Sequence, residues 1–302
     1  ITVPTIGWTP RDRSVRWGFS VAKYGAQTQT ECSYSGYPEW CRPDAGNGIL
    51  TGGGYVTGND PTDTSVAIGP SFVSDWVAHL VGRNGTAAQG GVRFYALDNE
   101  PMLWNSTHRD VHPAAGTYDE LWGCTTTYAA AVKAADPTAE VLGPVSWGWC
   151  EYFTSASDGC PDGPDRQAHG GLPLTEWYLR QVHDYEVAHG VRLVDWLDIH
   201  YYPQASGVYS GDESAAAVRL RSVKSLYDPN YTDESWIGEP VRLIPRMKAW
   251  IAARAPETKL AITEYSWGTD DDSISNALAQ AEVLAVYARE GVDMANRWVA
   301  PD

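Results

Sequence analysis

The chain has 302 residues, 43% of them hydrophobic, with a formal net charge of −16 and a pI near 4.7. A chain of this length can bury a large core. Its acidic surface would repel the phosphates of nucleic acids and of anionic membranes, which excludes both as expected partners. No apolar run approaches the roughly 18 residues of a membrane helix. No signal peptide is visible, which indicates a mature or trimmed chain.

Short apolar runs rich in β-branched residues recur along the chain and predict parallel strands that are buried on both faces. In chain order they are Thr2–Trp8, Val92–Asp98, Glu140–Trp147, Trp196–Tyr202, Lys259–Tyr265 and Met294–Trp298. Helical patterns lie between them, over Phe72–Arg83, from the capping box at Thr117–Glu120, and over Thr175–Ala188, Pro240–Ala255 and Ser273–Arg289. This alternation predicts an α/β barrel, although a closed barrel needs eight strands and six are recognisable. The long segment Ser20–Pro70, rich in turn residues, is expected to build part of a cleft rim.

Two of the predicted strands carry a glutamate to their carboxyl ends. Asn99-Glu100-Pro101 follows Val92–Asp98, and Glu264 lies near the end of Lys259–Tyr265. Catalytic residues of α/β barrels occupy this end of the strands, and hydrolysis of a glycosidic bond requires two carboxyl groups. Either glutamate alone could instead form a strand-end salt bridge, so it is the pair that indicates a glycosidase.

Aromatic and cysteine residues add two further indications. The chain has 14 Trp and 17 Tyr but only 4 Phe, and flat rings with a polar tip suit stacking on sugars, although many such rings fill cores. Cys32 and Cys41 bracket one turn-rich loop, and Cys150 and Cys160 bracket another, with Cys124 left over. Two local disulfides would suit a secreted, extracellular protein, whereas five reduced thiols would suit a cytosolic enzyme.

Longer motifs strongly resemble glycoside hydrolase family 44. They are Tyr95–Trp104, Ser106–Pro113, Thr5–Trp8, Phe19–Gly25, Gly58–Ser65, Asp198–Pro203 and Ile262–Gly268. The resemblance implies a (β/α)8 TIM barrel with a retaining mechanism and an endo-acting β-1,4-glucanase activity, on cellulose, mixed-linkage glucan or xyloglucan and sometimes on xylan or mannan. The expected partner is therefore a β-glucan polysaccharide or oligosaccharide.

In that family the acid/base follows strand four and the nucleophile follows strand seven, which makes Thr2–Trp8 strand three and Met294–Trp298 strand eight. Strands one and two, and the β-sandwich that usually accompanies the barrel, have no counterpart in the sequence. Residues 1–302 are therefore interpreted as a catalytic barrel domain that is incomplete at its N-terminus. Either the chain is a fragment, or another segment completes the barrel.

The resemblance assigns Glu100 as acid/base and Glu264 as nucleophile, and a retaining enzyme would hold the two carboxyl groups about 5–5.5 Å apart. Asn99 would bind the sugar 2-hydroxyl, or else cap the following turn. His200 and Tyr202 are two apart on one strand, so both point the same way, into the cleft or into the core. Trp298 would floor a sugar subsite. Further tryptophans at strand ends, some of which should line the cleft, are Trp8, Trp104, Trp147 and Trp267.

Metal binding is a weaker expectation. Asp44, Asp60 and Asp63 in the long loop offer the hard oxygen ligands that suit a structural Ca²⁺, or they are solvated turn residues. Catalysis itself would require no cofactor. Two alternatives stay open at this point: a carbohydrate-binding protein without catalysis, which would not need Glu100 and Glu264, and a xylanase or mannanase of the same clan.

Overall fold

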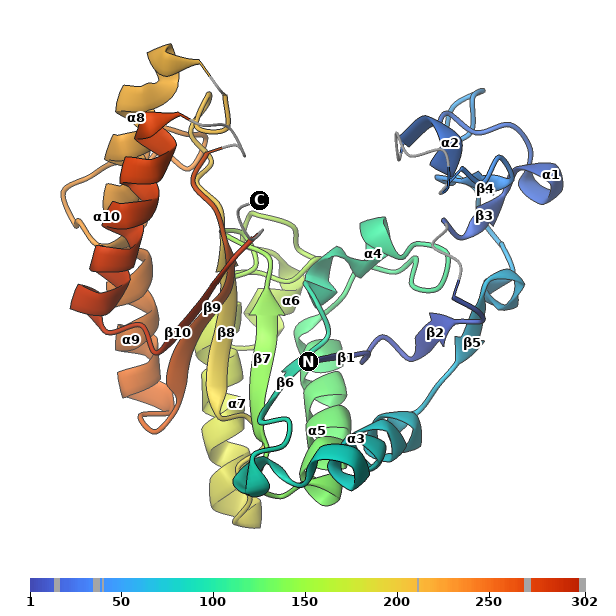
Figure 1. Ribbon diagram of the computed structural model, residues 1–302, viewed down its shortest axis with the longest axis horizontal. Helices are drawn as coiled ribbons and strands as arrows, with labels where there is room; N and C mark the ends of the chain where they lie inside the picture. Colours follow the sequence, from blue (N-terminus) through green and yellow to red (C-terminus); the bar gives the residue numbers. More distant parts are fainter. Residues whose placement is uncertain (14–16, 35–38, 40, 211, 269–272, 299–302) are drawn as a thin grey trace.

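Six parallel strands form the central sheet of the computed structural model, in the order β1-β6-β7-β8-β9-β10 (Figure 1). They are β1 (Thr2–Val3), β6 (Phe94–Leu97), β7 (Glu140–Ser146), β8 (Trp196–Tyr201), β9 (Lys259–Tyr265) and β10 (Met294–Arg297). The structure describes residues 1–302 apart from 14–16, 35–38, 40, 211, 269–272 and 299–302. All six predicted strands are present, and five of them end within two residues of the predicted limits.

The first predicted strand, Thr2–Trp8, is wrong beyond its second residue. Only Thr2 and Val3 pair with β6. Gly7 then adopts a φ of 84°, a left-handed conformation that glycine accepts without steric cost, and the chain leaves the sheet. Trp8 starts a separate strand, β2 (Trp8–Pro10), which pairs antiparallel with β5 (Ser65–Ala67).

The predicted helices cover the outer face of the sheet, with limits close to those expected. They are α3 (Pro70–Asn84), α5 (Tyr118–Ala135), α7 (Leu174–His189), α9 (Leu243–Arg254) and α10 (Ile274–Glu290). A shorter helix, α8 (Ala216–Ser222), was not predicted. Thr117 caps α5 by accepting a hydrogen bond from the Glu120 amide, as the capping-box motif predicts. None of the helices in the described ranges is long and apolar enough to cross a membrane.

Apolar side chains divide between the two faces of the sheet. On the outer face, Leu197, Ile199 and Ile262 belong to one buried cluster with α9 and α10, while Tyr95 and Val141 belong to another with α3, α5 and α7. A small third cluster, on the inner face, contains Leu142, Trp196 and Ala261 with Phe94, Ala96 and Met294 packed against it. Burial on both faces explains why these strands are almost continuously apolar.

The six strands of the sheet correspond to strands three to eight of a (β/α)8 barrel, and the helices cover them as in such a barrel. β1 and β10 are the outermost strands of the sheet (Figure 1). Residues of both outer strands, Thr2 and Met294 among them, line one cavity of about 700 Å³ on the inner face. A lobe with α1 (Val21–Tyr24), α2 (Glu31–Tyr34), β3 (Phe19–Ser20) and β4 (Ala45–Gly46) stands beyond the β2–β5 pair (Figure 1). The short helices α4 (Trp104–Thr107) and α6 (Pro164–Ala168) are the remaining α-helices of the described residues.

Candidate active site

Glu100 is held in an unusual backbone conformation just beyond β6. It has a φ of 51°, Asp98 has 65°, and Val145 at the end of the neighbouring strand β7 has 62°. The Glu100 amide donates to the Val145 carbonyl over 3.1 Å, which joins the ends of the two strands. A β-branched residue with positive φ is a rare outlier, and such strain persists only where surrounding contacts enforce it, commonly at functional sites.

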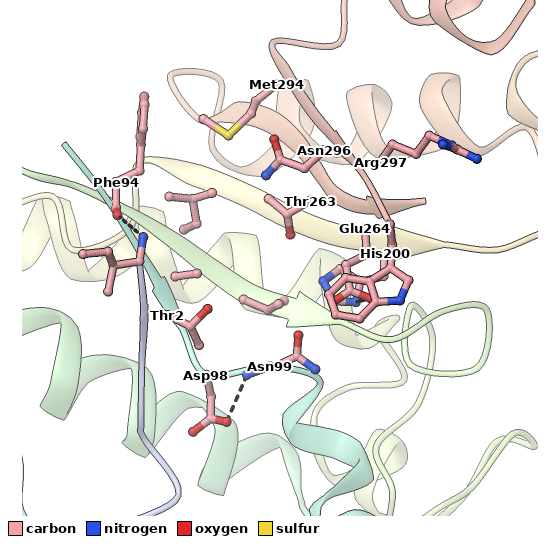
Figure 2. Close-up of a pocket in the computed structure, with 15 residues that line it drawn as sticks. Thr2, Phe94, Asp98, Asn99, His200, Thr263, Glu264, Met294, Asn296 and Arg297 are labelled. Atoms are coloured by element: carbon pink, nitrogen blue, oxygen red, sulfur yellow. Dashed lines mark hydrogen bonds and ion pairs between the residues drawn. The ribbon is translucent and has the colours of Figure 1, made fainter. Parts of the chain in front are cut away.

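Glu264 reaches the same end of the sheet through an irregularity in β9. The pairing of β8 with β9 is regular up to Ile199 and Ile262, and then shifts so that His200 pairs with Glu264. The extra residue, Thr263, lies between these two pairs. A bulge of this kind changes the direction of the following side chain, and here it places Glu264 beside His200 in the cavity (Figure 2).

Glu100, His200 and Glu264 converge on one point. Single ligand atoms of the three side chains all lie within 4.8 Å of one another. His200 Nδ1 lies 2.8 Å from Glu100 Oε1 and 3.5 Å from Glu264 Oε2. The His200 side chain is only 1% exposed, whereas the two carboxyl groups remain partly open. The buried imidazole therefore fixes the two carboxyl groups relative to each other.

Tyr202 supplies a second contact to Glu264. Its hydroxyl donates to Glu264 Oε2 over 2.9 Å. Burial, and then the Glu264 carboxylate, raise the pKa of the Tyr202 phenol, so it stays protonated and remains a donor at any physiological pH. His200 and Tyr202 thus point the same way, as their spacing predicts, and face the carboxyl groups rather than fill the core.

Asp98 ties the turn that carries Asn99 and Glu100 to its surroundings, a role that was not predicted. Asp98 Oδ2 accepts from the amides of Thr5 (2.6 Å) and Ile6 (3.0 Å). Its Oδ1 accepts from the Asn99 amide over 2.9 Å (Figure 2) and from Trp104 Nε1 over 3.3 Å. One carboxylate therefore holds together the chain after β1 and the turn after β6. Its position directly before Asn99-Glu100 was the only signal in the sequence.

Two further carboxyl groups are fully buried beside this cluster. Glu151 accepts from the Trp147 amide over 2.7 Å, and its other oxygen has no hydrogen-bond partner within the described residues. Burial raises the pKa of Glu151 to about 8, and the nearby Glu100 carboxylate contributes to this rise. Asp198 accepts from the Thr263 hydroxyl over 2.7 Å, and burial raises its pKa to about 7. Both groups are therefore largely protonated in mildly acidic solution.

Glu151→Gln is expected to stabilise the protein increasingly as the pH rises. The unfolded glutamate ionises near its ordinary pKa of 4.5, while the folded protein keeps the proton up to about pH 8, so this group lowers the free energy of unfolding progressively between these values. Glutamine keeps the acceptor for the Trp147 amide and does not ionise. The melting temperature of the variant should exceed that of wild type by roughly 3 °C or more at pH 8 and by much less at pH 4.5. A difference in melting temperature between variant and wild type that does not change with pH would contradict the assignment of Glu151 as a buried neutral acid.

The 700 Å³ cavity brings some of the predicted binding residues together. Its wall includes Asn99, His200 and Glu264 (Figure 2). Trp298 also belongs to this wall. Trp298 is 58% exposed, and its amide donates to the Tyr265 carbonyl over 2.9 Å, which fixes its backbone next to β9. Asn99 is exposed and lies across the cavity from Met294 and Asn296 of β10 (Figure 2). Both therefore remain available to a ligand beside the two carboxyl groups.

Four of the five predicted tryptophans do not line the main cavity, whose wall contains Trp298 alone among them. Trp267 is fully buried in the outer cluster and donates to Ser222 Oγ over 3.0 Å, and Trp104 is 3% exposed. Trp147 is partly buried and packs against the other outer cluster. A tryptophan at a strand end points to either face, and here the outer face offers a large apolar core. Trp8 lines a separate pocket, described below.

An exposed aromatic ring that sequence reasoning missed lies in the loop before α9. Trp236 is 58% exposed, and its indole nitrogen lies 3.5 Å from Gln204 Oε1. The Gln204 amide in turn donates to the Tyr202 carbonyl over 2.9 Å. These contacts place Trp236 next to the segment that follows β8. Its exposure depends on how the loop folds back, which no local pattern indicates.

The cysteine and aspartate expectations have different outcomes. The structure pairs Cys32 with Cys41 and Cys150 with Cys160, and leaves Cys124 as a thiol. The three candidate Ca²⁺ ligands, Asp44, Asp60 and Asp63, do not come together. Among the residues described, the cluster of potential metal ligands consists of Glu100, His200 and Glu264. Asp44 accepts from Ser20 and Ala22, Asp60 caps a turn at Thr62, and Asp63 pairs with Lys23 at 2.7 Å.

Comparisons with known proteins give one consistent result. The sequence model of glycoside hydrolase family 44 matches residues 1–205. Endoglucanase A of Paenibacillus lautus is 37% identical over 246 residues, which is 78% of this chain and 35% of that protein. The solved structure of CelM2, a bifunctional glucanase-xylanase from a metagenome library, superposes with a TM-score of 0.92 at 45% identity, covering 100% of this chain and 59% of CelM2. A family 44 xyloglucanase from Paenibacillus polymyxa gives 0.69 at 36% identity, over 75% of this chain and 46% of that one.

The chain thus spans about a third of the curated relative and somewhat more than half of CelM2. The match to the family covers both the Asn99-Glu100 turn and the His200–Tyr202 segment of the cavity. The resemblance predicted from the sequence motifs is confirmed, and the chain belongs to glycoside hydrolase family 44.

Proposed function

We propose that the chain carries the catalytic centre of a retaining, endo-acting β-1,4-glucanase. One observation carries the mechanism: oxygens of Glu100 and Glu264 lie within 4.8 Å of each other. Retaining glycosidases hold their carboxyl groups about 5–5.5 Å apart, whereas inverting enzymes need about 6.5–9.5 Å to admit a water molecule. The short separation supports direct attack by a carboxylate.

The proposed reaction proceeds in two displacements. First, the Glu264 carboxylate attacks the anomeric carbon, the bond to the leaving oxygen breaks, and that oxygen takes the proton of Glu100. Then Glu100, now a carboxylate, removes a proton from a water molecule that attacks the glycosyl ester, which releases Glu264 and the sugar. Two carboxyl groups and water balance both steps, so the proposed reaction requires no metal or cofactor.

The contacts around the glutamates support this division of roles. Glu264 Oε2 lies against Tyr202 and His200, while Oε1 has no hydrogen-bond partner among the residues described and is left to attack. Glu100 Oε1 is hydrogen-bonded to His200 Nδ1, which leaves Oε2 to carry the proton that is transferred to the leaving oxygen. Asn99 and Trp298, both in the cavity wall, would bind the 2-hydroxyl and the face of the sugar at the cleavage point.

Tyr202→Phe tests the tyrosine contact. Removing a hydrogen bond to an ionised group costs about 1.5–3 kcal/mol, so kcat/KM should fall roughly 10- to 100-fold. The phenyl ring fills the same space, so the melting temperature should change little. A loss of activity that parallels a loss of thermal stability would mean that Tyr202 serves the fold alone.

The substrate follows from the relatives and from charge. CelM2 is described as a glucanase-xylanase, and the Paenibacillus polymyxa protein as a xyloglucanase. We infer a neutral β-glucan as substrate, since a chain with a net charge of −16 disfavours anionic polymers. The two disulfides support secretion into the extracellular space, where such polymers occur.

We also infer that a further segment covers the outer strands β1 and β10 in the working enzyme, because uncovered strand edges invite aggregation.

The direct test is hydrolysis of carboxymethyl-cellulose, mixed-linkage glucan, xyloglucan, xylan and mannan by the purified chain. Reducing-sugar release should be largest on one of the glucans, and viscosity should drop early, as internal cleavage requires. Preference for xylan or mannan would change the substrate class. Tight binding of well-folded protein without cleavage would instead identify a carbohydrate-binding protein.

A further inference from the structure

A second pocket of about 290 Å³ lies directly beside the catalytic cavity and shares one wall residue with it, Asp98. One side of the second pocket comes from the β2–β5 pair and its approach, with Trp8, Thr9 and Thr64. The other side comes from the loop that follows α4, with His108 and Asp110. Both sides leave the carboxyl ends of β1 and β6, so the pocket opens on the same rim as Glu100.

Contacts between elements preform this pocket. The Ile68 amide donates to the Gly7 carbonyl over 2.9 Å, which extends the β2–β5 pairing towards the sheet. Asn59 Nδ2 donates to the Asp110 carbonyl over 2.8 Å. The Asp110 side chain lies so close to Gly18 that a Cβ atom there would be 2.0 Å from Asp110 Oδ2. The loop and the lobe therefore hold each other in place.

One polar group of this pocket lacks a partner. The Thr64 hydroxyl oxygen is buried and makes no hydrogen bond within the described part of the chain. Its backbone carbonyl, in contrast, accepts from the Arg11 amide over 2.9 Å. Buried hydroxyl groups are almost always hydrogen-bonded, so an unsatisfied one beside a pocket calls for an explanation. Thr64 also lines the pocket, so a rotation of its side chain would let this hydroxyl donate to or accept from a hydroxyl group of a ligand.

We propose that the second pocket is a subsite for a single neutral pyranosyl residue of the glucan substrate. Its volume lies at the lower limit of ligand pockets and suits one ring rather than a chain. The half-buried Trp8 offers an aromatic face for sugar C–H groups, and Thr64 and His108 offer partners for hydroxyl groups. Asp98 and Asp110 both line the pocket, and the acidic wall favours an uncharged sugar over a uronate.

This subsite rests on the proposed function, and two sources of the ring fit it equally well. A xylosyl branch of a decorated glucan could enter from the chain bound in the main cavity. A backbone glucosyl residue remote from the cleavage point could also reach it. The same contacts would recognise either ring. The two sources differ only in which oligosaccharide needs the pocket in order to bind tightly.

The test measures binding by titration calorimetry in a Glu100→Gln background, where hydrolysis is suppressed. The probes are cellohexaose and a xylosylated cello-oligosaccharide. Trp8→Ala should weaken binding roughly 3- to 10-fold, and Thr64→Val roughly 3-fold. Phe72→Ala, which removes an exposed ring on α3 outside both pockets, should leave both dissociation constants unchanged. Effects confined to the xylosylated probe identify a branch subsite, and effects on both probes identify a backbone subsite.

Unchanged affinity for both probes in folded Trp8→Ala and Thr64→Val variants would overturn the subsite. If Trp8→Ala does not fold, Trp8→Phe and Thr64→Val give the same decision with smaller changes. Tighter binding of a glucuronate-bearing oligosaccharide than of its neutral counterpart would overturn the assignment to uncharged sugars. Binding that depends on Trp8 in a wild-type protein that cleaves no glucan would leave the subsite standing and reject the proposed hydrolase function.

Discussion

Replacing Glu264 by glycine should abolish glucan hydrolysis, with kcat falling on the order of 10⁴- to 10⁶-fold. Glu264 lies in the cavity wall with one oxygen against Tyr202 and His200, and the other is the proposed nucleophile. Glycine removes the nucleophile but leaves Glu100 and His200 in place. Reducing-sugar release from carboxymethyl-cellulose and xyloglucan measures the loss.

Sodium azide separates a missing nucleophile from a damaged fold. Azide is small enough to enter the space left by the Glu264 side chain and to attack the anomeric carbon of an activated aryl cello-oligosaccharide. The product should then be an α-glycosyl azide, since one displacement inverts the configuration. Glu257→Gly, at an exposed glutamate before β9, is the matched control and should retain wild-type activity. Residual wild-type hydrolysis in Glu264→Gly would reject the assignment.

Glu100→Gln is the second large effect, and it should depend on the leaving group. Glutamine has no acidic proton, so kcat on unactivated glucan should drop about 10²- to 10⁴-fold. An aryl glycoside with a dinitrophenolate leaving group needs no protonation, so formation of its glycosyl-enzyme should remain fast. The second step, which lacks its base, should then become rate-limiting and produce a burst of released phenolate.

The comparison of the two substrates makes this prediction specific. Glu100 also contacts His200 at 2.8 Å, so a variant that disturbs the site as a whole would slow both substrates equally. Equal losses on glucan and on the activated glycoside, without a burst, would contradict the acid/base role. Circular dichroism and the melting temperature control for folding.

Sequence patterns predicted the sheet well because its strands are buried on both faces. Runs such as Lys259–Tyr265 are largely apolar, and the glutamates at two strand ends stand out against them. Parallel strands end at the same edge of a sheet, so the amino-acid sequence alone places Glu100 and Glu264 together, although they are 164 positions apart in the chain. The motifs of the family strengthened this placement.

Features that depend on local backbone turns or on tertiary burial were not predictable in this way. Gly7 turns the chain out of the sheet, and so moves Trp8 from the main cavity to a second pocket. Trp267 and Trp298 both follow strands but face opposite sides of the sheet. Trp267 is therefore buried in the outer cluster, whereas Trp298 is 58% exposed in the cavity wall. Glu151 is an ordinary loop residue in the sequence, and only the packing around it makes it a buried acid.

The measurement that tests the central claim most directly is the anomeric configuration of the first sugar released. Proton NMR during the early hydrolysis of a cello-oligosaccharide resolves the α and β reducing ends before mutarotation mixes them. Two displacements through Glu264, with oxygens of the two glutamates within 4.8 Å, predict that the β anomer forms first. Initial formation of the α anomer would show a single displacement by water and would contradict the covalent mechanism.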